Sequence, residues 1–313
     1  MKNIIKSKAW DIPYISLKNN RVLYQFSRSL QIANLHDNSI QASRKVSVDH
    51  YATLVVVERK EIIVATCANK HQIDILSLND LTLAQSMKGN VQRGFRREYS
   101  VLDEDEMNIY YIWYRDEIQK SIVTKFNLET YEEVIVVEFP KTFLFDIKYV
   151  EKKKNCLICG KEFYDEMTKD EVVGEYEIFW LGDFENRIIL KNLAKFSYAQ
   201  ANKIGISEKQ EILLFYTLNE NIVCNLNTNE ELVKLTWDSD VSFSENGKYI
   251  AYIEWGKTKV DIKIYSIEKQ KVIDEYMIEH HGYDLVRQLG FRGDDQYLVF
   301  RLHETMYMME FEK

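Results

Sequence analysis

Seven short runs of apolar, β-branched and aromatic residues recur along this chain, and they constrain its fold more than any other feature. They occupy residues 21–27, 61–67, 108–114, 155–161, 211–217, 248–254 and 296–302. Each run is nearly continuous in apolarity, which is typical of a β-strand that is buried on both faces. Windows with the apolar spacing and the caps of an amphipathic helix are nearly absent. The chain is therefore predicted to be all-β.

A polar pair precedes each run and predicts a tight turn. The pairs are Asn19-Asn20, Arg59-Lys60, Glu104-Asp105, Lys153-Lys154, Glu208-Lys209, Asn246-Gly247 and Asp294-Asp295. Successive pairs are 38 to 55 residues apart, so seven repeats nearly fill the 313 residues. Length alone would suggest about two domains. The repeat predicts a single domain over residues 1–313 instead.

Each repeat also holds strands of a different character after the apolar run. Alternating strands follow at residues 31–37, 72–80, 122–130, 221–229 and 261–269, and more polar fourth strands follow at 82–88 and 271–277. Four antiparallel strands in each repeat are typical of a β-propeller blade. The sequence thus predicts a single seven-bladed β-propeller with blades near residues 10–45, 46–90, 94–139, 141–192, 195–237, 238–279, and 280–313 plus 1–9.

Two segments carry a resemblance to a known family. The segment S-F-S-E-N-G-K-Y-I-A-Y-I (242–253), followed by I-Y-S-I-E-K-Q-K-V-I (264–273), resembles the repeat of tryptophan–aspartate (WD) and lactonase-like (YVTN-type) propellers, and G-F-R-G-D-D-Q-Y-L-V-F (290–300) is similar. The chain departs from the WD pattern because no Gly-His dipeptide opens a blade and Trp237-Asp238 falls on an outer strand. The resemblance implies a divergent propeller whose ligands bind at the face around the central channel.

The two ends of the chain are expected to complete one blade together. The last repeat has only three predicted strands, and residues 3–6 (N-I-I-K) precede the first complete blade. If this segment supplies the missing outer strand, the ring closes and leaves no exposed sheet edge there. Deleting residues 1–9 is then expected to destabilise the protein.

Composition narrows the functional classes. Hydrophobic residues make up 46% of the chain with both charge signs present, which predicts a folded core. The formal net charge of −8 argues against nucleic-acid and anionic-membrane partners. The first residues lack the apolar core of a signal peptide, and no window is apolar enough for a transmembrane helix. We expect a monomeric, cytoplasmic protein. With only 11 Gly and 2 Pro, its turns must rely on Asn, Asp, Glu and Lys.

The four cysteines suit a reducing compartment. Cys156 and Cys159 have the spacing of zinc or redox sites. A zinc site needs a second ligand pair, which is not found, and a redox motif needs a strand-to-helix turn, whereas residues 155–161 are predicted to form a strand. In a strand these two side chains point to opposite faces. Buried structural thiols are the favoured interpretation.

An acidic residue recurs where the chain enters a blade. Asp11, Asp146 and Asp240 stand in the similar segments W-D-I-P-Y, F-D-I-K-Y and S-D-V-S-F, and Asp49, Glu98 and Asp284 stand in looser copies. A ring of carboxylates at the channel mouth could hold a divalent cation. The alternative, which we favour because the residue repeats, is that each Asp accepts backbone hydrogen bonds and fixes the loop.

Basic and imidazole groups lie in connectors that the resemblance places on the same face. Arg93, Arg96 and Arg97 share one connector, His280 and His281 share another, and His50 follows Asp49. Guanidinium groups there would suit a carboxylate or phosphate ligand. Adjacent histidines point apart in extended chain and so are not expected to share a metal. A solvated loop is the simpler interpretation.

The connector over residues 160–176 is long and rich in carboxylates, but it lacks the spacing of an EF-hand loop. It is predicted either to contact a partner or to be mobile.

Motifs of common enzymes are missing: the sequence has no G-x-S-x-G, G-x-x-x-x-G-K-[ST], H-E-x-x-H or G-x-G-x-x-G. The leading hypothesis is a non-catalytic scaffold that binds a protein or peptide and carries no cofactor or metal. The alternative is a small-ligand binder or a metal-dependent, lactonase- or hydrolase-like enzyme with its site at the channel mouth. A third hypothesis is a toxin-neutralising or sensor protein whose acidic surface matches a basic partner.

Overall fold

The computed structural model describes residues 2–6, 14–16, 20–26, 29–34, 36–46, 51, 53–67, 72–88, 99–115, 120–140, 142–150, 154–162, 176–180, 204–207, 212–216, 220–225, 230–236, 241–244, 247–256, 259–279, 286–292, 297–302 and 305–311. Nearly all of them lie in β-strands, and the described helix is a single turn, η1 (Glu58–Lys60). No helix in these ranges is long and apolar enough to cross a membrane.

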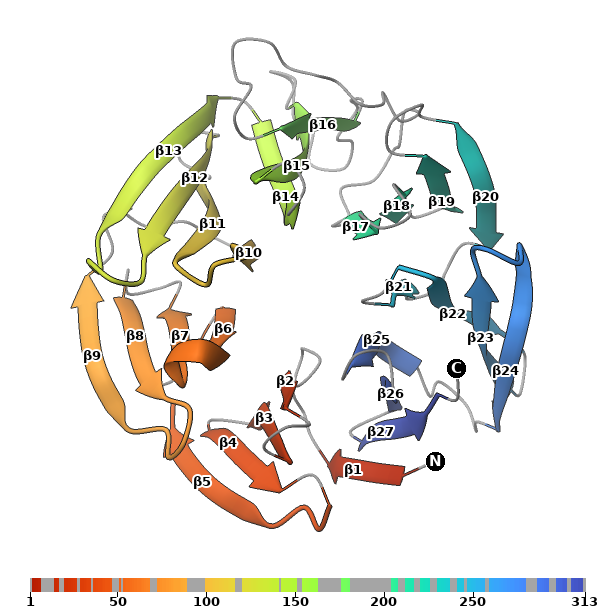
Figure 1. The fold of residues 1–313 in the computed structure, drawn as a ribbon, viewed down its shortest axis with the longest axis horizontal. Helices are drawn as coiled ribbons and strands as arrows, with labels where there is room; N and C mark the ends of the chain where they lie inside the picture. The colour runs from red at the N-terminus through yellow and green to blue at the C-terminus, as the bar shows by residue number, and fades with distance from the viewer. Residues whose placement is uncertain are drawn as a thin grey trace. The chain divides into compact units, whose positions relative to one another are not determined.

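The chain divides into two compact units, which are described separately. Unit 2 covers residues 49–204 and 225–230 and contains three antiparallel sheets (Figure 1). The first is β6 (Thr53–Val57), β7 (Ile62–Cys67), β8 (Gln72–Ser77) and β9 (Leu83–Lys88). The second is β10 (Tyr99–Leu102), β11 (Asn108–Arg115), β12 (Lys120–Asn127) and β13 (Glu133–Pro140). The third is β14 (Thr142–Val150), β15 (Asn155–Glu162) and β16 (Tyr176–Trp180).

Unit 1 covers residues 1–48, 205–224 and 231–313 and contains four further sheets. The first is β2 (Tyr14–Ser16), β3 (Arg21–Phe26), β4 (Ser29–Asn34) and β5 (Ile40–Lys45). The second is β17 (Ile204–Ser207), β18 (Ile212–Tyr216), β19 (Glu220–Asn225) and β20 (Glu231–Thr236). The third is β21 (Val241–Phe243), β22 (Tyr249–Trp255), β23 (Lys259–Ser266) and β24 (Lys271–Glu279). The fourth is β25 (Val286–Arg292), β26 (Tyr297–Leu302), β27 (Thr305–Glu310) and β1 (Lys2–Lys6).

The N-terminal strand joins the last sheet, as the sequence predicted. β1 pairs antiparallel with β27, with Lys2 opposite Met308 and Lys6 opposite Thr305 (Figure 1). The fourth strand of this sheet therefore comes from the opposite end of the chain.

The seven apolar runs are confirmed as strands. Each forms the second strand of its sheet, namely β3, β7, β11, β15, β18, β22 and β26. Their burial follows from their composition, since β7 keeps Ile63, Val64 and Ala65 at 0% exposure between its neighbours.

The turn before the second strand contains a left-handed residue wherever it is described. These residues are Asn20, Glu61, Glu106, Lys154 and Gly247, with φ between 46° and 69°. Glycine accepts this conformation freely, whereas other residues adopt it at a cost of roughly 1–2 kcal/mol. Gly247 is the one glycine among the five, so most of these hairpins form without the residue that suits them best.

The hairpin between the third and fourth strands repeats almost unchanged. An Asn or Ser begins it, and the backbone N–H of this residue donates to the carbonyl five residues later, as in Asn34 to Ser39, Ser77 to Thr82 and Asn127 to Glu132. The side-chain oxygen of the first residue also accepts a backbone N–H within the turn, at 2.7 Å in Asn34 and 2.9 Å in Asn127. Asn and Ser are favoured here because they cap their own turn.

A bulge follows in the fourth strand. One residue of the fourth strand has no partner in the third strand. In four sheets this residue comes seven positions after the first residue of the hairpin: Gln41, Ala84, Leu232 and Ile273. In β13 this residue is Val136, nine positions after Asn127. Bulges kink and twist a strand at the edge of a sheet.

Neighbouring sheets within each unit pack through apolar faces. In unit 2, side chains of β7 and β8 meet Tyr111, Trp113 and Phe126 of the next sheet, and a second cluster joins that sheet to β14 and β15. In unit 1, β22 and β23 pack on Phe291 and Phe300 of the last sheet. Burying each aromatic side chain contributes about 1.5–3 kcal/mol, so these interfaces hold the sheets face to face.

Candidate functional site

Most of the site residues predicted from sequence lie outside the described residues. These are Asp11, Asp49, His50, Arg93, Arg96, Arg97, Asp240, His280, His281 and Asp284. Glu98, Trp237-Asp238 and residues 163–175 of the acidic connector also lie outside them. Their proposed grouping around a channel therefore stays a prediction.

Asp146 is the exception, since its backbone is described. It lies inside β14 rather than in a connector, and it is opposite Cys159 of β15. The register shifts between Leu144 and Asp146. A bulge therefore lies beside Asp146, and the role of its carboxylate in the loop stays a prediction.

The predicted strand over the two cysteines is confirmed as β15. Cys156 forms no disulfide, has 0% exposure and packs with Ile112, Ile147 and Ile158. Burial, with a smaller contribution from the negative charge of Asp103, raises the pKa of the Cys156 thiol to about 12. A thiol held neutral in this way is a poor metal ligand and nucleophile. Across the described ranges, no three His, Cys, Asp or Glu side chains are grouped so as to hold a metal.

A groove of about 350 Å³ in unit 2 is lined by residues of β8, β9 and the β12–β13 hairpin. We call it the β9–β13 groove. Figure 1 shows β9 next to the sheet that contains this hairpin. Ile73, Met87 and Phe126 provide its apolar walls. These side chains belong to the core between two neighbouring sheets, and the groove lies where that core reaches the surface.

Charged groups line the mouth of this groove. Lys88 is the last residue of β9, Glu133 is the first residue of β13, and Glu132 comes just before it in the hairpin. Lys88 and Glu132 are exposed, whereas Glu133 keeps only 7% exposure. The groove thus joins a small apolar floor to a charged mouth.

The strand beside the groove is apolar on its surface. Val134, Ile135 and Val136 of β13 are 51%, 50% and 37% exposed. β13 is the last strand in the order β10-β11-β12-β13, so its far edge has no further strand in the described chain. Consecutive exposed apolar residues of this kind mark interaction surfaces.

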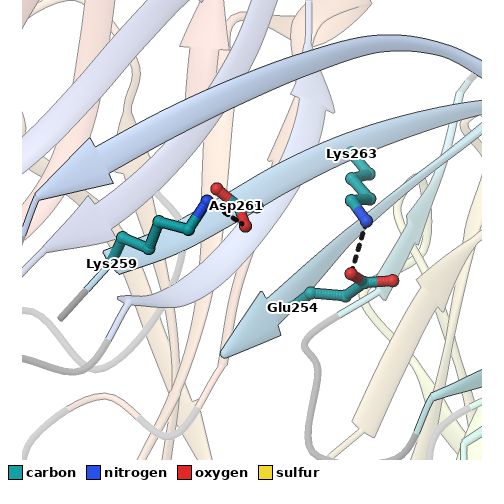
Figure 2. Close-up of polar contacts among 4 residues, drawn as sticks. All are labelled: Glu254, Lys259, Asp261 and Lys263. Atoms are coloured by element: carbon teal, nitrogen blue, oxygen red, sulfur yellow. Dashed lines mark hydrogen bonds and ion pairs between the residues drawn. The ribbon is translucent and has the colours of Figure 1, made fainter. Parts of the chain in front are cut away.

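A second polar group lies on β22 and β23 (Figure 2). Lys263 donates to Glu254, and the Lys259 ammonium is 3.5 Å from the Asp261 carboxylate. The hydrogen bond to Glu254 raises the pKa of the Lys263 ammonium above its usual value. Partly exposed pairs of this kind contribute about 0.2–1 kcal/mol each, so this charge ladder links two strands rather than forming a reactive centre.

The same position in another sheet holds a neutral pair. Trp113 Nε1 donates to Thr124 Oγ1 at 2.8 Å, and both residues are buried. The two pairs have the same geometry in their sheets. Trp113 lies opposite Ile122, two residues before Thr124, and Glu254 lies opposite Asp261, two residues before Lys263. The Glu254–Lys263 pair therefore occupies the position in its sheet that Trp113–Thr124 occupies in the other, but it is more exposed to water. This correspondence supports a structural role for the charge ladder.

Comparison with known proteins gives the architecture a context. No family model and no curated protein matches the sequence. Among solved structures, the chain is similar to the β-propeller domain of Cps50 (Swd1) from Myceliophteria thermophila, with a TM-score of 0.66 and 12% identity over 100% of both chains. The chain has a β-propeller fold. At this identity the likeness shows the fold of the propeller and leaves its ligands open.

The sequence analysis did not single out the groove or the β13 surface. The signal was present, because the fourth strand reads E-V-I-V-V-E-F (133–139) where β9 reads L-A-Q-S-M-K (83–88). An apolar run is ordinarily taken as buried, and in this propeller it is exposed.

Proposed function

We propose that this chain is a closed propeller of seven blades, WD-like and lactonase-like in type, that binds a protein or peptide without catalysing a reaction. Seven sheets among the described strands support the blade number, and the pairing of β1 with β27 supports closure. The proposed protein is a cytoplasmic monomer whose blades act as a rigid support for a binding surface.

The observation that carries the binding function is the exposed run Val134–Val136 beside the β9–β13 groove. Water-exposed apolar side chains in a row cost free energy unless a partner covers them. Interfaces of this kind need a rigid apolar centre with a polar rim, and the groove supplies both.

Affinity purification of the full chain from its native extract tests this function. We expect one partner at stoichiometric amount that stays bound through size-exclusion chromatography. A chain that elutes alone, at its monomer mass, from extracts prepared at low and at physiological salt would contradict the proposal.

The scaffold is also proposed to hold no metal. Elemental analysis of purified protein is expected to find no stoichiometric Ca, Mg, Mn or Zn, and added metal is expected to leave the melting temperature unchanged. One bound ion per chain would instead favour the metal-dependent alternative.

A further inference from the structure

The edge of β13 differs from the edges of the other described fourth strands. In β5, β9, β20 and β24 the bulge comes seven residues after the start of the hairpin, which places it after the first residue pair in β5, β9 and β20 and after the second in β24. In β13 it comes two residues later, at Val136. Glu133, Val134 and Ile135 therefore stay in unbroken register with β12. Beside the hairpin, the edge of β13 is therefore regular over three residues, compared with one or two residues in β5, β9, β20 and β24.

The side chains of this edge are also unprotected by charge. Four apolar residues lie between Glu133 and Glu138 with no charged residue among them. β24 is longer, but Lys271, Asp274 and Glu275 interrupt its apolar residues. Charged residues on an edge strand discourage pairing with another chain. β13 lacks that protection over its central residues.

The charge beside this edge indicates what kind of segment would pair with it. Glu132, Glu133 and Lys88 are the charged residues that line the β9–β13 groove, which leaves one excess formal negative charge there. Glu129 adds another carboxylate in the same hairpin, and the Lys60 ammonium, which donates to the Leu128 carbonyl at 3.0 Å, offsets that charge. The whole chain carries a net charge of −8. A basic partner is therefore attracted both locally and at long range.

We propose that β13 is a docking edge to which an extended segment of a partner protein adds as a fifth strand. The segment carries a Lys or Arg whose alkyl chain enters the β9–β13 groove toward Glu132 and Glu133, and β-branched residues that cover Val134–Val136. Main-chain hydrogen bonds along the edge supply affinity, and the groove selects the basic residue. This inference rests on the proposed binding function and names the surface and the partner chemistry.

Binding of a designed peptide to the full chain tests the inference. The probe is a fluorescein-labelled peptide, KVTVKVT, and the comparison peptide EVTVEVT has the same strand propensity with opposite charge. Fluorescence anisotropy is expected to show saturable binding of KVTVKVT and at least about tenfold weaker binding of EVTVEVT, a difference of about 1.4 kcal/mol. Hydrogen exchange is expected to show new amide protection over residues 133–137 when KVTVKVT is bound.

Two variants separate the edge from general surface effects. Ile135→Lys places a charge on the exposed edge and is expected to weaken KVTVKVT binding at least about tenfold. Leu232→Lys makes the same change on β20, where the side chain is 45% exposed compared with 50% for Ile135. The Leu232→Lys variant is expected to bind like the unmodified chain, and circular dichroism should show that both variants are folded.

Four results would overturn the docking edge: no KVTVKVT binding up to 1 mM, equal affinity for both peptides, unchanged affinity in Ile135→Lys, or no protection over residues 133–137. Sedimentation of the protein alone adds a further check, since self-association that Ile135→Lys abolishes would assign the edge to a second copy. If the Ile135→Lys variant still binds the native partner, the proposed binding function is kept and only the docking edge is ruled out.

Discussion

The reactivity of Cys156 is set by its burial rather than by the residues next to it in the sequence. Cys156 belongs to a spacing that suggests metal or redox chemistry, yet it lies in the core with a pKa raised to about 12. Its folded pKa is above the ordinary value of 9.0, so the neutral thiol stabilises the fold. That contribution is fully present below pH 9 and is lost as the pH rises toward 12.

We therefore expect Cys156 to resist alkylation. Iodoacetamide at pH 8.5 should leave it unmodified in the folded chain and label it fully in denaturant, because only the thiolate reacts. Peptide mapping by mass spectrometry measures this site separately from the other cysteines. Labelling of Cys156 in the native protein at the rate of a free thiol would show that the site is accessible.

At the scale of the elements, the hairpins explain how the chain manages with few glycines. Left-handed residues occupy the turns, but their side chains differ in burial: Lys154 is exposed, whereas Leu81 keeps only 1% exposure. The strain is similar at the two positions, with φ of 46° and 62°. What holds Leu81 in place is the apolar surface that it buries.

This contrast predicts opposite outcomes for one type of substitution. Lys154→Gly relieves the left-handed strain and is expected to stabilise the protein by about 0.5–1 kcal/mol, after the larger entropy of an unfolded glycine is included. Leu81→Gly relieves the same strain but loses a buried side chain, so it is expected to destabilise by about 1–3 kcal/mol. Urea unfolding of both variants measures the difference, and changes of the same sign would contradict it.

The positions of the second strands were predictable from sequence, whereas the exposure of the apolar residues on β13 was not. The seven apolar runs could be found because apolar, β-branched composition is a local property, and all seven are second strands. The run over Val134–Val136 has the same composition, but its place at the end of the strand order depends on which segment pairs beside it. Asp146 was predicted at the entry to a blade, and its backbone lies within β14, next to a register shift.

At the scale of the whole molecule, the last sheet depends on both ends of the chain. β27 has β26 on one side and β1 on the other. Without β1, the edge of β27 and its backbone N–H and C=O groups lose their partners.

Deletion of residues 1–9 is accordingly expected to lower the melting temperature by at least about 5 °C, which corresponds to about 2 kcal/mol for a chain of this size. Differential scanning calorimetry measures the change. A synthetic peptide of residues 1–9, added in trans, should restore part of the loss. An unchanged melting temperature would show that the β1–β27 pairing is dispensable.

The β1–β27 pairing also has a consequence for how the protein is made. β1 leaves the ribosome about 300 residues before its partner strand does. During that interval β1 lacks the strand with which it pairs in the finished fold. A chain whose synthesis stops early can form several sheets but never the last one. Synthesis as far as β27 is thus recorded in one strand pair, and an unpaired β1 marks a chain released before that strand was made.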